Sequence, residues 1–205
     1  METPAKNLLL MLALGAALNL GVQSTAAEVG QPAPDFTLTD IDGHTHTLSS
    51  YKGKLVVLEW VNPECPFVQK HYNKSGNIPG LQKTYTAQGV IWLSINSAAP
   101  GRQGDFDPAH VKAWMQKVSA VPTAYFRDQT GMVGHLYGAK TTPHIFIINP
   151  AGTLVYAGGI DSIASANPAD IARATNYVNA AMADLAAGRP VALSNTKPYG
   201  CSVKY

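Results

Sequence analysis

Apolar residues along the chain fall into short runs, and the spacing of these runs predicts strands that alternate with helices. Residues 55–61 (LVVLEWV) and 90–96 (VIWLSIN) are mainly apolar and rich in β-branched and aromatic residues, as expected of strands buried on both faces of a sheet. Residues 123–126 and 145–148 predict two further strands, and the second of these forms a hairpin with residues 153–157 across the turn sequence NPAG. This order of elements is typical of an α/β domain.

Helices are predicted between the strands from their start signals and from the spacing of apolar residues. The segment from Pro66 onward and residues 79–87 have helical character, and proline is well tolerated in a first helical turn. Residues 108–118 place apolar side chains on one helical face. An Asn-Pro pair opens residues 167–185, for which we predict one long helix ended by a glycine and followed by a proline.

The two ends of the chain differ from this alternating part. Residues 1–27 combine a positive charge, a short apolar run and small residues suited to cleavage, which is the composition of a secretory signal peptide. Residues 29–50 predict an N-terminal extension with a short hairpin. The last residues have no periodicity and predict a tail laid over the surface. We therefore expect a signal peptide at residues 1–27, one domain at 28–190 and a tail at 191–205.

Charge and hydropathy narrow the classes of partner. The formal net charge is +2 over 205 residues, with neither a basic stripe nor an acidic tail, so nothing points to nucleic acid. No second long apolar stretch follows the signal segment, and we expect no stable membrane insertion after its cleavage. The sequence thus predicts an exported protein, periplasmic if the source is a Gram-negative bacterium. Export brings the chain into an oxidising compartment, where cysteine pairs readily form disulfides.

Cys65 is the residue whose position most suggests chemistry. It follows the predicted strand at residues 55–61, at the point where the chain passes into a helix. The helix dipole and the unpaired backbone N–H groups at a helix N-terminus favour a thiolate over a thiol. The other cysteine of the sequence, Cys201, lies in the tail. Three relations between the two fit the sequence: a reversible redox pair, a permanent structural disulfide, and two independent thiols.

A resemblance to the redoxin group is carried by two segments, GQPAPDFTLTDIDGHTHTLSSYKGKLVVLEWVNPECPF and TTPHIFIINPAGTLVYAGGID. This group includes the alkyl hydroperoxide reductase and thiol-specific antioxidant (AhpC/TSA) proteins, the peroxiredoxins and the TlpA-like thioredoxins. The resemblance implies a thioredoxin-like fold, in which helices flank a central mixed sheet, with an N-terminal hairpin extension and a C-terminal tail. It also implies a thiol-based oxidoreductase without a cofactor, with Cys65 at the reactive position and Pro143 as the cis proline facing it.

Two positions near Cys65 depart from the better-known branches of this group. Thioredoxin-type oxidoreductases have a second cysteine three residues after the first, where this chain has Val68. Peroxiredoxins have threonine or serine three residues before the reactive cysteine, where this chain has Asn62. An amide donates and accepts hydrogen bonds, so we expect Asn62 to orient or hydrogen-bond near the sulfur. Peroxiredoxin-like sites also use an arginine to polarise the peroxide, for which the candidates are Arg127, which we prefer, and Arg102.

The hypothesis that best accounts for these features is an exported thiol-dependent oxidoreductase. Cys65 attacks a disulfide or peroxide, Cys201 resolves the adduct, and Pro143 shapes the substrate groove. The expected partners are a protein thiol or disulfide, or a peroxide, together with a reductant that the sequence does not identify. An alternative enzyme is a thiol peroxidase that reduces hydroperoxides. An alternative of another class is a non-catalytic domain, either stapled by a disulfide or carrying copper on Cys65, Cys201 and His144.

Overall fold

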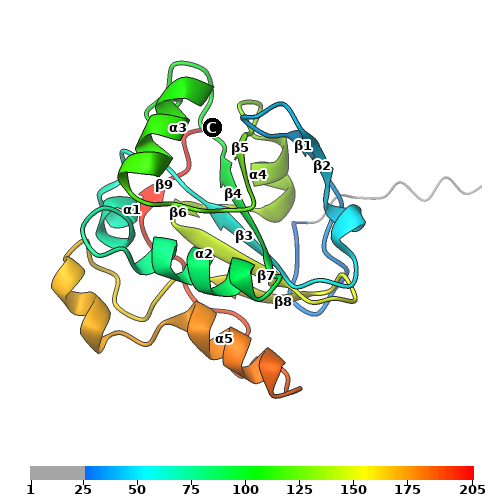
Figure 1. Ribbon diagram of the computed structural model, residues 1–205. Coiled ribbons are helices and arrows are strands. Elements are labelled where there is room, and N and C mark those ends of the chain that lie inside the picture. The colour runs from blue at the N-terminus through cyan, green and yellow to red at the C-terminus, as the bar shows by residue number, and fades with distance from the viewer. Residues whose placement is uncertain (1–25) are drawn as a thin grey trace, which may run out of the picture.

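A five-stranded mixed sheet forms the centre of the molecule (Figure 1). The computed structural model describes residues 26–205, so nearly all of the predicted signal peptide lies outside the described residues. The strand order is β5-β4-β3-β7-β8, with β3 (Val56–Trp60), β4 (Ile91–Asn96), β5 (Ala124–Arg127), β7 (His144–Ile148) and β8 (Leu154–Gly158). Strands β3, β4 and β5 run parallel, whereas β7 is antiparallel to both β3 and β8. The predicted mixed sheet is confirmed.

Helices cover both faces of this sheet. One face packs against α1 (Pro66–His71), α2 (Asn77–Ala87), α3 (Pro108–Lys117) and α5 (Tyr177–Ala186), and the other packs against α4 (Met132–Tyr137) (Figure 1). Along β3, the side chain of Val57 points to the first face, whereas Leu58 and Trp60 belong to the core on the second face. This alternation follows from the two-residue period of a strand. It explains why the central strands are apolar on both sides.

The N-terminal extension forms the predicted hairpin from β1 (Thr37–Thr39) and β2 (Thr45–Thr47), followed by the 3₁₀ helix η1 (Leu48–Tyr51). The carboxylate of Asp40 closes its turn, because it accepts hydrogen bonds from the backbone N–H groups of Asp42 and His44. The hairpin leads into Leu48, which is buried in the core beside α4. The extension therefore completes the second face of the sheet.

The prediction of one long helix over residues 167–185 is wrong. The chain forms a 3₁₀ helix, η2 (Pro168–Arg173), and then breaks before α5 begins at Tyr177. At the break, the Ser162 N–H donates to the carbonyl of Thr175, and the Thr175 N–H donates to the side-chain oxygen of Ser162. The Tyr177 N–H donates to the carbonyl of Ile160. The side chain of Asn176 then caps α5 by accepting from the Asn179 N–H. Pairing with residues 160–162 therefore replaces helical hydrogen bonds at this point, and the side-chain cap restarts the helix.

After α5, the tail returns to the end of the sheet where β3 leads into α1. In Figure 1 its last residues pass beside α1 and end near α3. Two residues of the tail form β9 (Cys201–Ser202), which pairs antiparallel with β6 (Thr141–Thr142). Neither short strand is evident from sequence patterns, since each is only two residues long. The tail is thus joined to the segment directly before Pro143.

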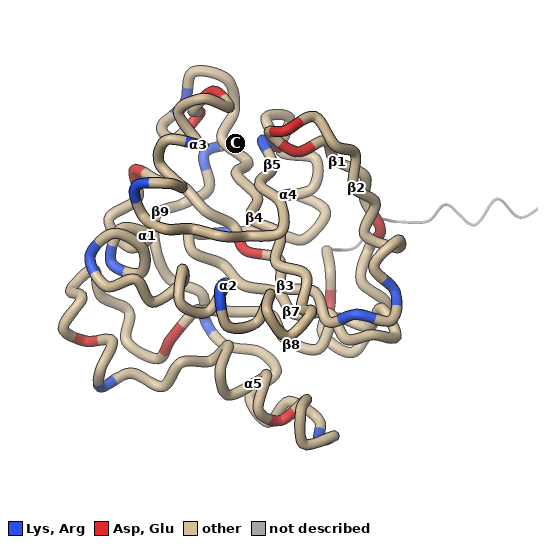
Figure 2. The backbone as a smooth tube through the Cα atoms, viewed as in Figure 1, with Lys and Arg blue, Asp and Glu red and all other residues tan. Residues whose placement is uncertain are grey.

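Charges of both signs are interspersed along the backbone in Figure 2. Within residues 26–205, the structure contains no helix with the length and apolar character needed to cross a bilayer.

Glu59 is a carboxylate in the middle of β3 with no exposed surface. It accepts hydrogen bonds from Tyr72 Oη at 2.7 Å and from Trp92 Nε1 at 2.8 Å, and further bonds from Gln82 and Ser94. Burial raises the pKa of Glu59 to about 7, because removal from water disfavours the charged form more than these four donors stabilise it. The side chain thus joins β3, β4, α1 and α2 while carrying a titratable proton in the core.

We predict that Glu59→Gln reduces the pH dependence of stability. The pKa of the folded protein, about 7, exceeds the ordinary value of 4.5, so between these values the native state binds a proton that the unfolded chain has lost. The contribution of this proton to the free energy of unfolding is fully present below pH 4.5 and is lost as the pH rises through 7. The free energy of unfolding, measured with urea at pH 5 and pH 8, should therefore change less in the variant. Glu28→Gln, an exposed control, should keep the wild-type slope, and an unchanged slope in Glu59→Gln would refute this assignment.

Candidate active site

Cys65 lies between the end of β3 and the start of α1. It is the N-cap residue of α1, and Pro66 occupies the first helical position. The turn that leads to it is closed by a hydrogen bond from the Cys65 N–H to the carbonyl of Asn62 at 3.0 Å. The residue is 0% exposed. The thiol is therefore placed at the start of a helix, as the sequence predicts, but beneath other parts of the protein.

The segment before Pro143 lies against this thiol. The Thr142–Pro143 peptide bond is cis, as the resemblance implies. The Cys65 thiol donates a hydrogen bond to the carbonyl oxygen of Thr142, with Sγ and oxygen 3.1 Å apart. Thr142 belongs to β6, so the Cys65 thiol faces a short strand that also pairs with the tail.

Cys201 is the tail residue that pairs with Thr142 in the β6–β9 ladder. Both cysteines are free thiols, with Cys65 buried and Cys201 half-buried. Burial raises the pKa of Cys201 to about 12, and the neighbouring Cys65 adds to this effect. At neutral pH, Cys201 therefore keeps its proton while it rests beside Cys65. The structure brings together two sulfurs that stand at opposite ends of the domain in the sequence.

Gly200 permits the close approach of the tail. Its φ of +140° is rarely adopted by residues with a side chain, and a Cβ at this position would stand 2.0 Å from the carbonyl oxygen of Thr142. The backbone of Thr142 cannot move freely, because it precedes Pro143 and pairs with Cys201. A glycine directly before Cys201 is thus a condition for the tail to lie on β6.

Asn62 has a different set of partners from the predicted one. Its amide nitrogen donates to the carbonyl of Gln103 at 3.1 Å, and its side-chain oxygen accepts from the Glu64 N–H at 2.9 Å. Glu64 in turn accepts from the Gly104 N–H at 2.6 Å. Both side chains therefore tie the turn before Cys65 to the loop after β4. Asn62 orients this turn through its backbone and side chain, and no hydrogen bond joins its amide to the sulfur.

Arg127 is not brought to Cys65 by a direct contact. Its guanidinium forms an ion pair with Asp105, with nitrogen and oxygen 2.8 Å apart, at the end of β5. Asp105 also accepts from the side chain of Gln129. The arginine proposed from the sequence to polarise peroxide is thus engaged with the loop after β4.

His144 is not placed to complete a copper site with the two cysteines. It alternates with Ile145 along β7, so it faces the same side of the sheet as Phe146, whereas Cys65 belongs to the core on the opposite side. Its Nδ1 accepts from the Lys140 N–H, and burial lowers its pKa to about 3. Within residues 26–205, no three or more His, Cys, Asp or Glu side chains are grouped to hold a metal. The predicted ligand set of Cys65, Cys201 and His144 is therefore not assembled.

The end of the tail is held by Tyr205, whose role the sequence analysis did not identify. Its ring stacks on His135 with centroids 3.9 Å apart, and its hydroxyl donates to the carbonyl of Ala139. A Cβ at Gly131 or Gly134 would come within 2.6 Å of this ring, so α4 accommodates Tyr205 where it lacks side chains. The pattern of glycines in residues 131–134 is the one sequence signal that marks this contact.

Comparison with known proteins identifies the family. The sequence profile of the AhpC/TSA family matches residues 29–157. The chain belongs to the AhpC/TSA family. The redoxin resemblance seen in the sequence is therefore confirmed.

Two relatives of this redoxin are named thiol-disulfide oxidoreductase ResA. One, from Geobacillus kaustophilus (strain HTA426), is 37% identical over 102 residues, which are 45% of this chain and 53% of the relative. The other, from Geobacillus thermodenitrificans (strain NG80-2), is 30% identical over 154 residues, which are 71% of this chain and 78% of the relative. The chain thus spans about half the length of the first relative.

The solved structure of an uncharacterized conserved protein from Geobacillus kaustophilus is similar over most of both chains. It has a TM-score of 0.75 and 28% sequence identity, and the match covers 87% of this chain and 92% of that chain. The overlap extends beyond the profile match, so the two proteins share their fold over most of this chain.

We predict that Gly200→Ala uncovers Cys65 in this redoxin. The added Cβ would overlap the Thr142 carbonyl, so β9 must lift from β6. Alkylation of Cys65 by iodoacetamide, followed by peptide mass spectrometry, should become about tenfold faster, equivalent to ~1.4 kcal/mol in the opening equilibrium. Gly188→Ala is the matched control, because Gly188 also has a positive φ but a Cβ there meets nothing within 4 Å. Equal rates of Cys65 alkylation in the two variants would contradict the proposal that β9 shields Cys65.

Proposed function

We propose that this redoxin catalyses thiol–disulfide exchange, with Cys65 as the attacking thiol and Cys201 as the resolving thiol. The observation that carries the proposal is the pairing of Cys201 with Thr142, whose carbonyl oxygen also accepts the hydrogen bond of Cys65. A resolving thiol three residues after Cys65 is absent, since that residue is Val68. The tail supplies the missing sulfur from the other end of the domain.

The exchange proceeds in two displacements. The Cys65 thiolate attacks one sulfur of a substrate disulfide, so a Cys65–substrate disulfide forms and the other substrate sulfur leaves as a thiolate. The Cys201 sulfur then attacks Cys65, releases the second substrate thiolate and closes a Cys65–Cys201 disulfide. The proton of Cys201 passes to a departing thiolate. The substrate gains two electrons, the protein loses two, and an external dithiol reductant restores both cysteines.

Contacts around the thiol favour disulfide exchange over peroxide reduction. The side chain of Asn62 stands where peroxiredoxins have a hydroxyl, and both of its polar atoms hydrogen-bond to the backbone. The guanidinium of Arg127 is paired with Asp105. Among the described residues, no hydrogen bond or ion pair directs either side chain to the Cys65 sulfur. The names of the two relatives agree with exchange, and thiol peroxidase activity is the alternative that a direct assay decides.

Access to Cys65 requires displacement of the tail. The thiol has no exposed surface, and β9 occupies the edge of β6 beside it. Removing β9 exposes the unpaired backbone edge of Thr141–Thr142, next to Pro143. Such an edge pairs with an extended polypeptide, so we assign the substrate to proteins whose disulfide lies in an extended segment. Pro143 then shapes one wall of that groove.

Export forms part of the same proposal. Residues 1–27 have the composition of a signal peptide, residues 28–190 would form the exported redoxin domain, and residues 191–205 would form the tail that carries Cys201. Oxidising surroundings supply disulfides as substrates. In a Gram-negative source the compartment would be the periplasm.

We predict that Cys65→Ser abolishes exchange. A hydroxyl is a far weaker nucleophile than a thiolate at neutral pH, so the first displacement cannot occur. Turnover is measured as reduction of oxidised glutathione by dithiothreitol with catalytic amounts of protein. Ser202→Ala, an exposed change in the tail, should keep wild-type turnover. Retained turnover in Cys65→Ser would remove the proposed role of Cys65.

We predict that Cys201→Ser stops the reaction after the first displacement. With excess 5,5′-dithiobis(2-nitrobenzoate), the wild-type protein should release two thionitrobenzoate ions from each chain and end as the Cys65–Cys201 disulfide. The variant should release one and retain a Cys65 adduct, visible by mass spectrometry. Ser202→Ala should behave as the wild type. A variant that retains no adduct would exclude Cys201 as the resolving thiol, and rapid oxidation of wild-type Cys65 by hydrogen peroxide would instead favour the peroxidase.

A further inference from the structure

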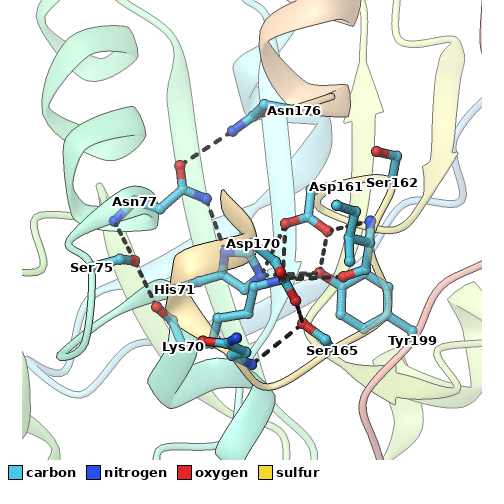
Figure 3. A network of polar contacts seen from close by, with 12 residues as sticks. Lys70, His71, Ser75, Asn77, Asp161, Ser162, Ser165, Asp170, Asn176 and Tyr199 are labelled. Carbon is cyan, nitrogen blue, oxygen red and sulfur yellow. Dashed lines mark hydrogen bonds and ion pairs between the residues drawn. The ribbon is translucent and has the colours of Figure 1, made fainter. Parts of the chain in front are cut away.

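A buried polar network joins the helix of Cys65 to the tail of Cys201 (Figure 3). Lys70, from α1, is 0% exposed on its side chain and forms an ion pair with Asp161, which is 2% exposed, with nitrogen and oxygen 3.1 Å apart. The hydroxyl of Tyr199 points into this pair from the tail, as Figure 3 shows. Burial of an unpaired charge is costly, so the ion pair needs each of its hydrogen bonds.

The ammonium group of Lys70 has three N–H donors, and all three are used. They go to the carboxylate of Asp161 at 3.1 Å, the carbonyl of Ile163 at 3.1 Å and the hydroxyl oxygen of Tyr199 at 3.2 Å. Since the site excludes water, a donor that loses its acceptor has no substitute. Tyr199 is therefore required to complete the solvation of a buried cation.

His71 adds a second donor to the same phenol oxygen. Its Nδ1 accepts from the side-chain amide of Asn77 at 2.9 Å, so its proton is on Nε2, which lies 3.1 Å from Tyr199 Oη. Burial lowers the pKa of His71 to about 4, which keeps the ring neutral at pH 7. The phenol O–H in turn donates to Asp161. Tyr199 thus accepts two hydrogen bonds and donates one, which uses the full capacity of its hydroxyl group.

The ring of Tyr199 is held as well as its hydroxyl. Phe67, two residues after Cys65, meets it edge to face with centroids 5.9 Å apart, and the Lys70 ammonium lies 5.4 Å from the ring centroid. Phe67 and Lys70 both belong to α1, the helix that begins after Cys65. Tyr199 stands two residues before Cys201 and is separated from it by Gly200 alone.

We infer that Tyr199 is a positioning residue that keeps Cys201 beside Cys65. The inference rests on the proposed function and goes beyond it, because it names the group that keeps the resolving thiol within reach. Tyr199 fixes the tail to α1 on one side of Gly200, and Cys201 lies on the other side. When a substrate displaces β9, bending at Gly200 can lift Cys201 while Tyr199 stays bound. The resolving sulfur therefore remains near the adduct on Cys65.

The test compares Tyr199→Phe with Tyr85→Phe. Tyr85 also donates a hydrogen bond from its hydroxyl, to Asn179 at an exposed contact between α2 and α5, so it controls for the loss of a phenol hydroxyl. The equilibrium between the Cys65–Cys201 disulfide and glutathione is measured by mass spectrometry. Tyr199→Phe should lower the equilibrium constant for disulfide formation about tenfold, equivalent to ~1.4 kcal/mol, and Tyr85→Phe should not change it.

Hydrogen exchange of the reduced protein gives a second readout that does not depend on redox chemistry. In Tyr199→Phe, the amide of Val203, which donates to the carbonyl of Lys140, should exchange faster, while the amides of β3 keep their protection. Unchanged exchange at Val203, or equal loss of protection in β3, would overturn the inference. If the wild type forms no Cys65–Cys201 disulfide, the proposed function fails. The hydrogen-exchange measurement then still decides whether Tyr199 holds the tail.

Discussion

The positions of both thiols in the site depend on the backbone of Thr142. The carbonyl accepts the hydrogen bond of the Cys65 thiol, and the residue pairs with Cys201 across the β6–β9 ladder. One residue thus contacts both Cys65 and Cys201. Because Thr142 precedes Pro143 and continues into β7, its position is set by the central sheet. The geometry of the two thiols therefore follows from the geometry of the sheet.

Two buried ionisable side chains, each surrounded by hydrogen-bond partners, fix the positions of the helices on this sheet. Glu59 gathers donors from α1, α2 and β4 around β3, and Lys70 joins α1 to Asp161 and the tail. Each group is costly to bury alone and is satisfied only in one arrangement of its neighbours. Together they leave α1 little freedom to shift, since both sets include residues of its last turn or its C-cap, Lys70 and Tyr72. The position of Cys65 at the start of α1 is thereby defined.

Sequence patterns predicted the elements that depend on local signals. Strands β3 and β4 were evident because a buried strand needs an unbroken apolar run, and the cis bond at Pro143 followed from the resemblance to redoxins. Helix α4 was not predicted, since it is six residues long and lies between Gly131 and Gly138, both with a positive φ. The break before Asn176 was not predicted either, because it results from pairing with a distant segment.

The partners of the site residues were harder to predict than the residues themselves. The sequence singled out Cys65 and Cys201, but the strand that brings them together is two residues long and has no local pattern. Asn62 was expected to orient or hydrogen-bond near the sulfur. It lies in the turn before Cys65, and the sequence did not show that its amide binds the backbone of a loop far away in the sequence. His144 was placed with the cysteines because it follows Pro143, but the alternation of β7 turns it to the other face. Such errors arise where a side chain has several suitable partners and only the folded chain selects one.

The position of Cys201 at the end of the tail links redox state to the stability of the whole domain. A bond from Cys201 to Cys65 would close a ring that contains β4, β5, β7 and β8 of the central sheet and the helices α1 to α5. Closing a ring of this size removes much of the conformational freedom of the unfolded chain, on the order of 5 kcal/mol. By thermodynamic linkage, whatever the bond contributes to folding, folding contributes equally to the bond. Oxidation would then make the protein harder to unfold, and partial unfolding would make the bond easier to reduce.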